Sequence, residues 1–166
     1  MIIGEAMRDF LFTLCLFSDT ATIVKDSVHS STLEDFKEDE YIPCGMTALY
    51  DAVGKTLSIS KESSKVIVII LTDGCENSSR EYSRSMIKKI TKEKESKGWK
   101  FIYLGANQDS YLESNKLGLR AGISYDYEYN DAGLRNIMRS TSDTVRVLRT
   151  QNFEPTANDN VVDEEI

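Results

Sequence analysis

The chain has 166 residues, enough for one domain with a hydrophobic core, and its 40% hydrophobic and 28% charged residues are ordinary for a globular protein. Its net charge of −7 argues against nucleic acid or an anionic membrane as the main partner, because both attract basic surfaces. No apolar run approaches the roughly 20 residues of a membrane-spanning helix, and residues 1–10 lack the pattern of a signal peptide.

The cysteines and the single histidine do not form a zinc-site pattern. Cys15, Cys44 and Cys75 are widely spaced, without a C-x-x-C pair, and His29 is the only histidine. Cys15 falls in an apolar run and reads as a small core residue. We expect a protein of the reducing cytoplasm. A nucleophilic Cys–His pair stays open as a minor alternative.

The first third of the chain predicts a hairpin followed by a loop and a helix. The apolar run at 11–17 is typical of a strand, and the short "SDT" segment separates it from a second strand at 21–28. Two strands joined by so short a loop are antiparallel. Residues 30–45 read as a polar loop. The helix expected at 47–59 has the apolar spacing of an amphipathic helix in Leu49, Val53 and Leu57.

Strands and helices alternate over the remainder. The sequence predicts strands at 66–71, 99–105 and 122–129, and helices at 78–98, 109–118 and 130–150. The helix at 78–98 begins with serine, ends at Gly98, and has an apolar face of Tyr82, Met86, Ile87 and Ile90. The last helix has Asn130 as its cap, and we expect Leu134, Ile137, Met138, Val145 and Leu148 to face inward.

This alternation predicts an α/β domain over residues 1–150, with a doubly wound, mostly parallel sheet and an antiparallel edge hairpin. Residues 151–166 read as an acidic, disordered tail. Ile69 lies in the middle of the 66–71 strand, in a sheet that we expect to be covered on both faces, so its side chain should be buried. Ligands of such sheets bind at the carboxyl ends of the strands, where Asp73, Asn107 and Asp109 fall.

Thr47 and Asp73 are candidate metal ligands. Thr47 lies at a loop-to-helix junction and Asp73 at a strand end, and hydroxyl and carboxylate oxygens suit Mg²⁺. Two alternatives stay open. Thr47 caps the helix, or Asp73 accepts hydrogen bonds from the backbone of its own turn beside Gly74. Asn107 and Asp109 are candidate partner contacts, although Asp109 also suits a helix cap.

Two motifs together carry a resemblance to a known family. "GMTALYDA" from Gly45 and "LTDG" at the end of the 66–71 strand resemble the second and third motifs of the von Willebrand factor A domain, and "FIYLGANQD" resembles its bacterial and phage branch. The resemblance covers roughly residues 10–150. It implies a Rossmann-like fold, a metal-ion-dependent adhesion site with Thr47 and Asp73 as ligands, and a protein-binding role without enzyme activity. Gly45 and Met46 would then lie beside the site as partner contacts.

The chain departs from that family at its start. The first motif, Asp-x-Ser-x-Ser, is missing, and so is the strand before it, which predicts an N-terminally truncated domain with a partial site and weak Mg²⁺ binding. Without that strand, exposed strand edges would favour self-association. A non-functional fragment of a longer protein stays open as an alternative, as does a hydrolytic enzyme using Asp73. The chain has no phosphate loop, G-x-S-x-G elbow or dinucleotide fingerprint to support an enzyme.

Overall fold

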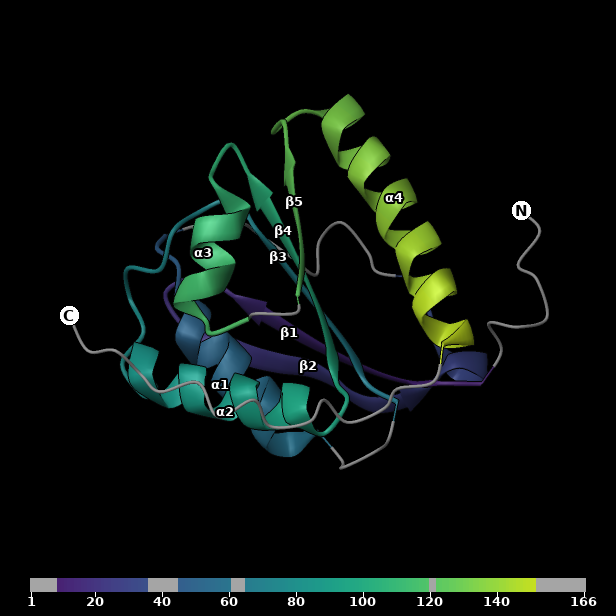
Figure 1. Ribbon diagram of the computed structural model, residues 1–166, viewed down its shortest axis with the longest axis horizontal. Helices are drawn as coiled ribbons and strands as arrows, with labels where there is room; N and C mark the ends of the chain where they lie inside the picture. Colours follow the sequence, from purple (N-terminus) through teal and green to yellow (C-terminus); the bar gives the residue numbers. More distant parts are fainter. Residues whose placement is uncertain (1–8, 36–44, 61–64, 120–121, 152–166) are drawn as a thin grey trace. The chain divides into compact units, whose positions relative to one another are not determined.

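The computed structural model describes residues 9–35, 45–60, 65–119 and 122–151 (Figure 1). The chain divides into two compact units. The first comprises Met1–Glu62 and Gly74–Ile87, and the second comprises Ser63–Asp73 and Lys88–Ile166. The boundary between them crosses helix α2, Arg84–Ser96, after Ile87. Each unit is described by itself.

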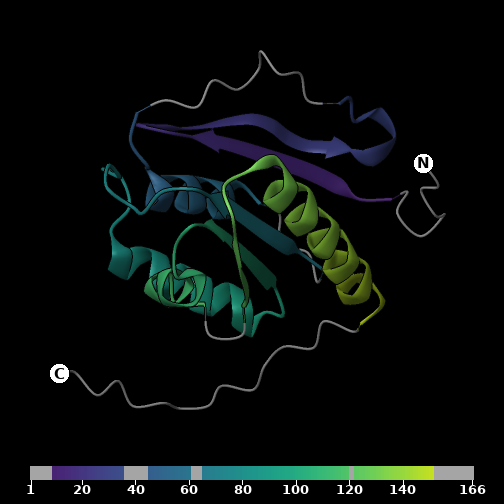
Figure 2. The same cartoon turned by 90° about the horizontal axis from the view of Figure 1, so that it is seen from above.

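The first unit contains the antiparallel hairpin and one helix. Strand β1, Leu11–Phe17, pairs with β2, Ala21–His29, and the two lie side by side in Figure 2. A short 3-10 helix, η2, follows at Ser30–Thr32. Helix α1, Leu49–Ile59, contacts both strands. Its predicted apolar stripe is confirmed, because Leu49, Val53 and Leu57 are all buried.

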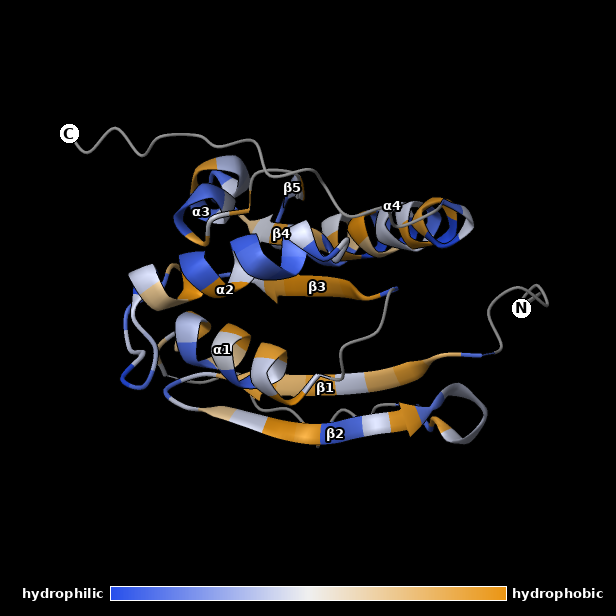
Figure 3. Cartoon of the chain, turned by 60° about the horizontal axis from the view of Figure 1, so that its bottom comes forward, coloured by the Kyte–Doolittle hydropathy of each residue, from blue (hydrophilic) through white to orange (hydrophobic). Residues whose placement is uncertain are grey.

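The second unit is built on a parallel sheet with the strand order β3-β4-β5. The strands are β3, Ile67–Thr72; β4, Lys100–Ala106; and β5, Ile123–Tyr127. Helix α3 spans Ser110–Lys116 and helix α4 spans Asp131–Thr150. Apolar residues of β4 and α4 form a buried cluster of Ile102, Leu104, Ile137 and Leu148. Figure 3 shows β3 as apolar along its length and α4 as amphipathic.

Several predictions about elements are confirmed. The hairpin is antiparallel, the three later strands are parallel, and α/β is the fold class of the chain. Asn130 caps α4 as expected, since its side chain accepts a hydrogen bond of 2.8 Å from the backbone N–H of Gly133. Among the described helices, none combines the length and apolar character needed to cross a membrane.

Other predictions, about helix bounds, buried side chains and the joining of the sheet, are wrong. Helix α2 begins at Arg84, because residues 79–82 are tied to α1 as described below. Ile69 is 47% exposed, since β3 is the last strand on its side of the parallel sheet. Leu134 and Met138 are each 42% exposed, because they flank the α4 stripe that contacts the sheet. Among the described strands, the hairpin and the parallel strands form separate sheets, so the single joined sheet is not observed. The predicted tail lies outside the described residues beyond Gln151.

Candidate functional site

The loop before α1 is fixed to the end of the hairpin. Gly45 has φ +82°, a conformation that favours glycine, and a side chain there would collide with the carboxylate of Asp19. The backbone N–H of Met46 donates a hydrogen bond to that same carboxylate. The Met46 side chain is 50% exposed. The first unit therefore presents an apolar side chain on an anchored loop.

Thr47 is joined to the segment after Gly74. Its backbone N–H donates to Oδ1 of Asn77 at 2.8 Å, and the backbone N–H of Asn77 donates to the carbonyl of Thr47 at 3.1 Å. The Thr47 hydroxyl lies against Gly74, where an added Cβ would be 2.5 Å from Oγ1. The cap of α1 is Ala48, which makes no side-chain capping bond, so the alternative that Thr47 caps this helix is wrong.

Glu76 supplies the missing cap from outside the helix. Its carboxylate accepts from the backbone N–H of Tyr50 at 2.8 Å, from the backbone N–H groups of Ser78 and Ser79, and from the Ser79 hydroxyl. Oγ of Ser79 in turn accepts from the backbone N–H of Asp51 at 3.1 Å. Orphan N–H groups at a helix start favour an anionic acceptor. One carboxylate thus fixes both the helix start and the turn at 76–79.

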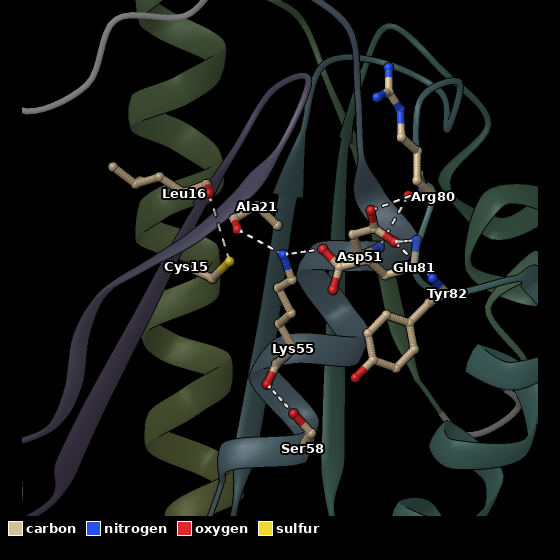
Figure 4. A network of polar contacts seen from close by, with 10 residues as sticks. Cys15, Leu16, Ala21, Asp51, Lys55, Ser58, Arg80, Glu81 and Tyr82 are labelled. Atoms are coloured by element: carbon tan, nitrogen blue, oxygen red, sulfur yellow. Dashed lines mark hydrogen bonds and ion pairs between the residues drawn. The ribbon is translucent and has the colours of Figure 1, made fainter.

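Asp51 reaches back from α1 to the same segment. Its buried carboxylate accepts three backbone hydrogen bonds, from Arg80 at 2.9 Å, Glu81 at 2.9 Å and Tyr82 at 2.8 Å (Figure 4). Burial alone would raise the pKa of this carboxyl, but the three N–H groups and the nearby charge of Lys55 outweigh burial and hold the pKa below its ordinary value. Asp51 is therefore ionised at neutral pH.

Two further contacts complete this association. Lys55 forms an ion pair of 2.7 Å with Glu81 and donates to the carbonyl of Ala21, and the hydrogen bond to Glu81 raises its pKa. The ring of Tyr82 covers Gly54 of α1, at a distance that leaves no room for a Cβ. We call Glu76–Tyr82 the α1 clamp. It has no regular secondary structure of its own, and its conformation is set by contacts with α1.

An open pocket of about 350 Å³ lies beside the clamp. It is lined by Asp19, Met46, Asn77, Ser78, Ser79 and Arg80. The hydroxyl oxygen of Ser78 is buried and has no hydrogen-bond partner among the described residues. Arg80 is exposed. The pocket therefore combines an apolar side chain, a guanidinium group and uncharged polar groups on backbone that the clamp fixes.

The second unit holds the other predicted contact residues. Asp109 caps α3, accepting from the backbone N–H of Leu112 at 2.9 Å, which confirms the alternative of a helix cap. Asn107 has φ +49°, and its side chain accepts from the backbone N–H of Tyr129. Both line an open pocket of about 560 Å³ with Gln108, Asp126, Tyr127 and Glu128. Their side chains shape the loops after β4 and β5.

The candidate metal ligands do not form a metal centre by themselves. Thr47 belongs to the first unit, and Asp73, which is exposed after β3, belongs to the second. The nearby carboxylates of Asp19, Asp51 and Glu76 all accept backbone N–H groups. In the described ranges no group of three or more His, Cys, Asp and Glu side chains is placed to hold an ion. One hydroxyl and one carboxylate do not fit Mg²⁺ without further ligands.

Ser31, His29 and Asp9 form a chain of hydrogen bonds, the residue types of a catalytic triad. His29 lies 2.7 Å from Oγ of Ser31 through Nδ1 and 2.9 Å from Asp9 through Nε2. The same Nδ1 accepts the backbone N–H of Ser31, so the imidazole caps the 3-10 helix. The Asp9 side chain is 92% exposed, and a carboxylate in water orients an imidazole only weakly. Cys15 is paired in the hairpin with Ile23 and is not joined to His29.

Sequence reasoning missed the residues that organise the clamp. Asp51 lies between the buried residues Leu49 and Ala52 in the helix. An acid among apolar neighbours indicates that its carboxylate has hydrogen-bond donors or a cation close by. Glu76 follows a strand end in a polar run that reads equally well as the start of a helix. Nothing local indicates that its partner is Tyr50, which lies 26 positions earlier.

No family model, curated protein or solved structure matches the chain. The resemblance to the von Willebrand factor A domain therefore depends on the two sequence motifs alone.

Proposed function

We propose that this chain is a protein-binding module that uses the surface around Met46 and Arg80. The observation that supports the proposal is the α1 clamp. Asp51 and Glu76 hold the clamp on α1 through backbone N–H groups, so the side chains at the pocket rim extend from an ordered backbone. Binding to a preorganised surface costs less conformational entropy than binding to a loose one.

The chemistry of this surface favours recognition over catalysis. The carboxylates of Asp51 and Glu76 accept backbone hydrogen bonds and therefore have a structural role in the clamp. Met46 is 50% exposed and Arg80 is exposed beside it in the pocket lining, and methionine and arginine are both enriched in protein interfaces. We expect Mg²⁺ to contribute weakly, because the candidate ligands Thr47 and Asp73 belong to different units. A von Willebrand factor A type of adhesion site is thus proposed in reduced form.

An affinity-capture comparison tests the proposal. Immobilised wild-type chain is compared with Met46→Asp, Arg80→Glu and the control Lys89→Glu, whose exposed site lies on α2 outside the first unit. Bound proteins from a lysate of the source cells are quantified by mass spectrometry, with and without EDTA. We expect the two pocket variants to lose a protein that wild type and control retain, with little effect of EDTA. Identical profiles for all four chains would contradict the proposal.

A further inference from the structure

Strand β3 has one covered face and one exposed face. Side chains alternate along a strand, and Ile70 and Thr72 are buried. The other face carries Ile69, which is 47% exposed, and Leu71, which is 38% exposed. Ile67 shares this face and packs partly against the core of the second unit. An apolar stripe therefore runs along the exposed face of the strand.

Opposite charges flank this stripe. Lys65 precedes the strand and Asp73 follows it, and both residues are exposed. Lys65 and Asp73 lie just outside the strand Ile67–Thr72, one beyond each end. Along the chain the order is therefore a positive charge, the strand with its three outward apolar side chains, and a negative charge. A second copy that runs antiparallel therefore places its negative end beside the positive end of the first copy, and its positive end beside the negative end.

One edge of β3 has no paired strand in the part of the chain that the structure describes. Among the described strands, β3 pairs only with β4. The carbonyl of Val66 accepts from the backbone N–H of Lys100 at 3.0 Å, so even-numbered residues of β3 direct their polar groups toward β4. In a parallel pair the alternate residues direct theirs to the opposite edge. Ile67, Ile69 and Leu71 thus present N–H and C=O groups at an edge that suits an added strand.

We propose that two copies of this chain associate by antiparallel pairing of their β3 strands, with Ile69 opposite Ile69 of the second copy. This register places Ile67 opposite Leu71 of the second copy and Lys65 opposite Asp73 of the second copy. It brings outward-facing backbone groups together at each pair, as an antiparallel ladder requires. Opposite charges that face each other across two strands stabilise the pairing.

Charge complementarity selects this register over its neighbours. The pairing can shift only in steps that keep outward-facing residues opposite each other. One step places Lys65 opposite Leu71 of the second copy, and the step in the other direction places Ile67 opposite Asp73 of the second copy. Both shifts bury a charge against an apolar side chain, which is unfavourable. The register centred on Ile69 avoids both contacts.

The same pattern identifies the occupant as a second copy. A two-fold interface requires one surface to be complementary to itself: if residue i of one copy contacts residue j of the other, then residue j of the first copy contacts residue i of the second. The β3 edge meets that condition in charge, and pairing would bring the exposed side chains of Ile69 and Leu71 against those of the second copy. The proposed dimer does not use the Met46–Arg80 surface, since β3 belongs to the second unit and that surface belongs to the first.

Charge reversal tests the register. The full chain, Lys65→Asp, Asp73→Lys and the double variant carrying both changes are compared by sedimentation equilibrium, with circular dichroism as a check of folding. We expect a wild-type dimer, a dimer dissociation constant raised at least about tenfold in each single variant, and restoration in the double variant. The control Lys89→Asp, exposed on α2, should leave the dimer unchanged.

Hydrogen exchange locates the contact. In the wild-type dimer the backbone amides of Ile69 and Leu71 should be protected, and dilution to the monomer should remove that protection. A wild-type chain that stays monomeric at about 100 μM would overturn the proposal. So would protected amides in a monomer, because β3 would then be paired within its own chain. A dimer that survives both single charge reversals would refute this register and the proposal with it.

Discussion

Replacing Asp51 by Asn should release the α1 clamp. The substitution keeps the size of the side chain but removes its charge and turns one oxygen into an N–H donor. In the wild type Oδ1 accepts from Glu81 and Tyr82, and Oδ2 accepts from Arg80. In the variant one of these oxygens is lost, so at least one backbone N–H faces another donor in a buried site.

The magnitude follows from these contacts. An orphaned buried donor costs about 1–3 kcal/mol, and hydrogen bonds to a charged group are stronger than neutral ones by about 1 kcal/mol. We therefore expect Asp51→Asn to destabilise the clamp by about 2–4 kcal/mol. At about 1.4 kcal/mol per tenfold change, amide exchange at 80–82 should accelerate about 30- to 700-fold. The matched control is Asp143→Asn on α4, where the carboxylate is 64% exposed and pairs only with Arg146 among the described residues.

Hydrogen exchange followed by mass spectrometry or NMR measures this effect directly at residues 80–82. The difference should also depend on pH. The pKa of Asp51 is lowered in the folded chain, so its stabilisation is complete above the ordinary aspartate pKa of about 3.9 and is lost as the pH falls through the lowered value. The difference in amide exchange rate at residues 80–82 between the wild type and Asp51→Asn should therefore become smaller below about pH 4. Equal exchange in Asp51→Asn and the Asp143→Asn control would refute the assigned role of the Asp51 carboxylate.

Three further predictions concern the candidate metal ligands, the sheet of the second unit and the contact between Gly54 and Tyr82. Calorimetric titration with Mg²⁺ should reveal no site tighter than about millimolar, and sub-micromolar binding that Asp73→Ala abolishes would contradict the partial ligand set. Ile102 lies in the buried cluster, so Ile102→Ala should lower the free energy of unfolding by about 2–5 kcal/mol. Ile69 is half-exposed on β3, so Ile69→Ala should lower it by less than about 1.5 kcal/mol. Both are measured by denaturant titration at concentrations where the chain is monomeric, and equal losses would argue against the strand order. Gly54→Ala should displace the Tyr82 ring and cost about 1–3 kcal/mol, measured by the same titration, and an unchanged midpoint would show that the ring does not depend on this close approach.

Local patterns determined most of the secondary structure of this protein. The apolar stripe of Leu49, Val53 and Leu57 set helix α1, and Asn130 marked the start of α4. Short loops and continuous apolar runs identified the hairpin and the three parallel strands. These predictions succeed because hydrophobic periodicity and helix caps depend on neighbours within one turn or one strand.

Only the tertiary structure decided where the carboxylates act and which strand lies at an edge. Residues 78–83 have a helix-like composition, yet Asp51 accepts long-range hydrogen bonds from the backbone N–H groups of residues 80–82. Glu76 in turn accepts a long-range hydrogen bond from the backbone N–H of Tyr50. An apolar run such as that around Ile69 indicates a strand but not whether a neighbour covers it. Both features depend on contacts between residues far apart in the chain, and the energy of such contacts leaves no periodic signal in the sequence.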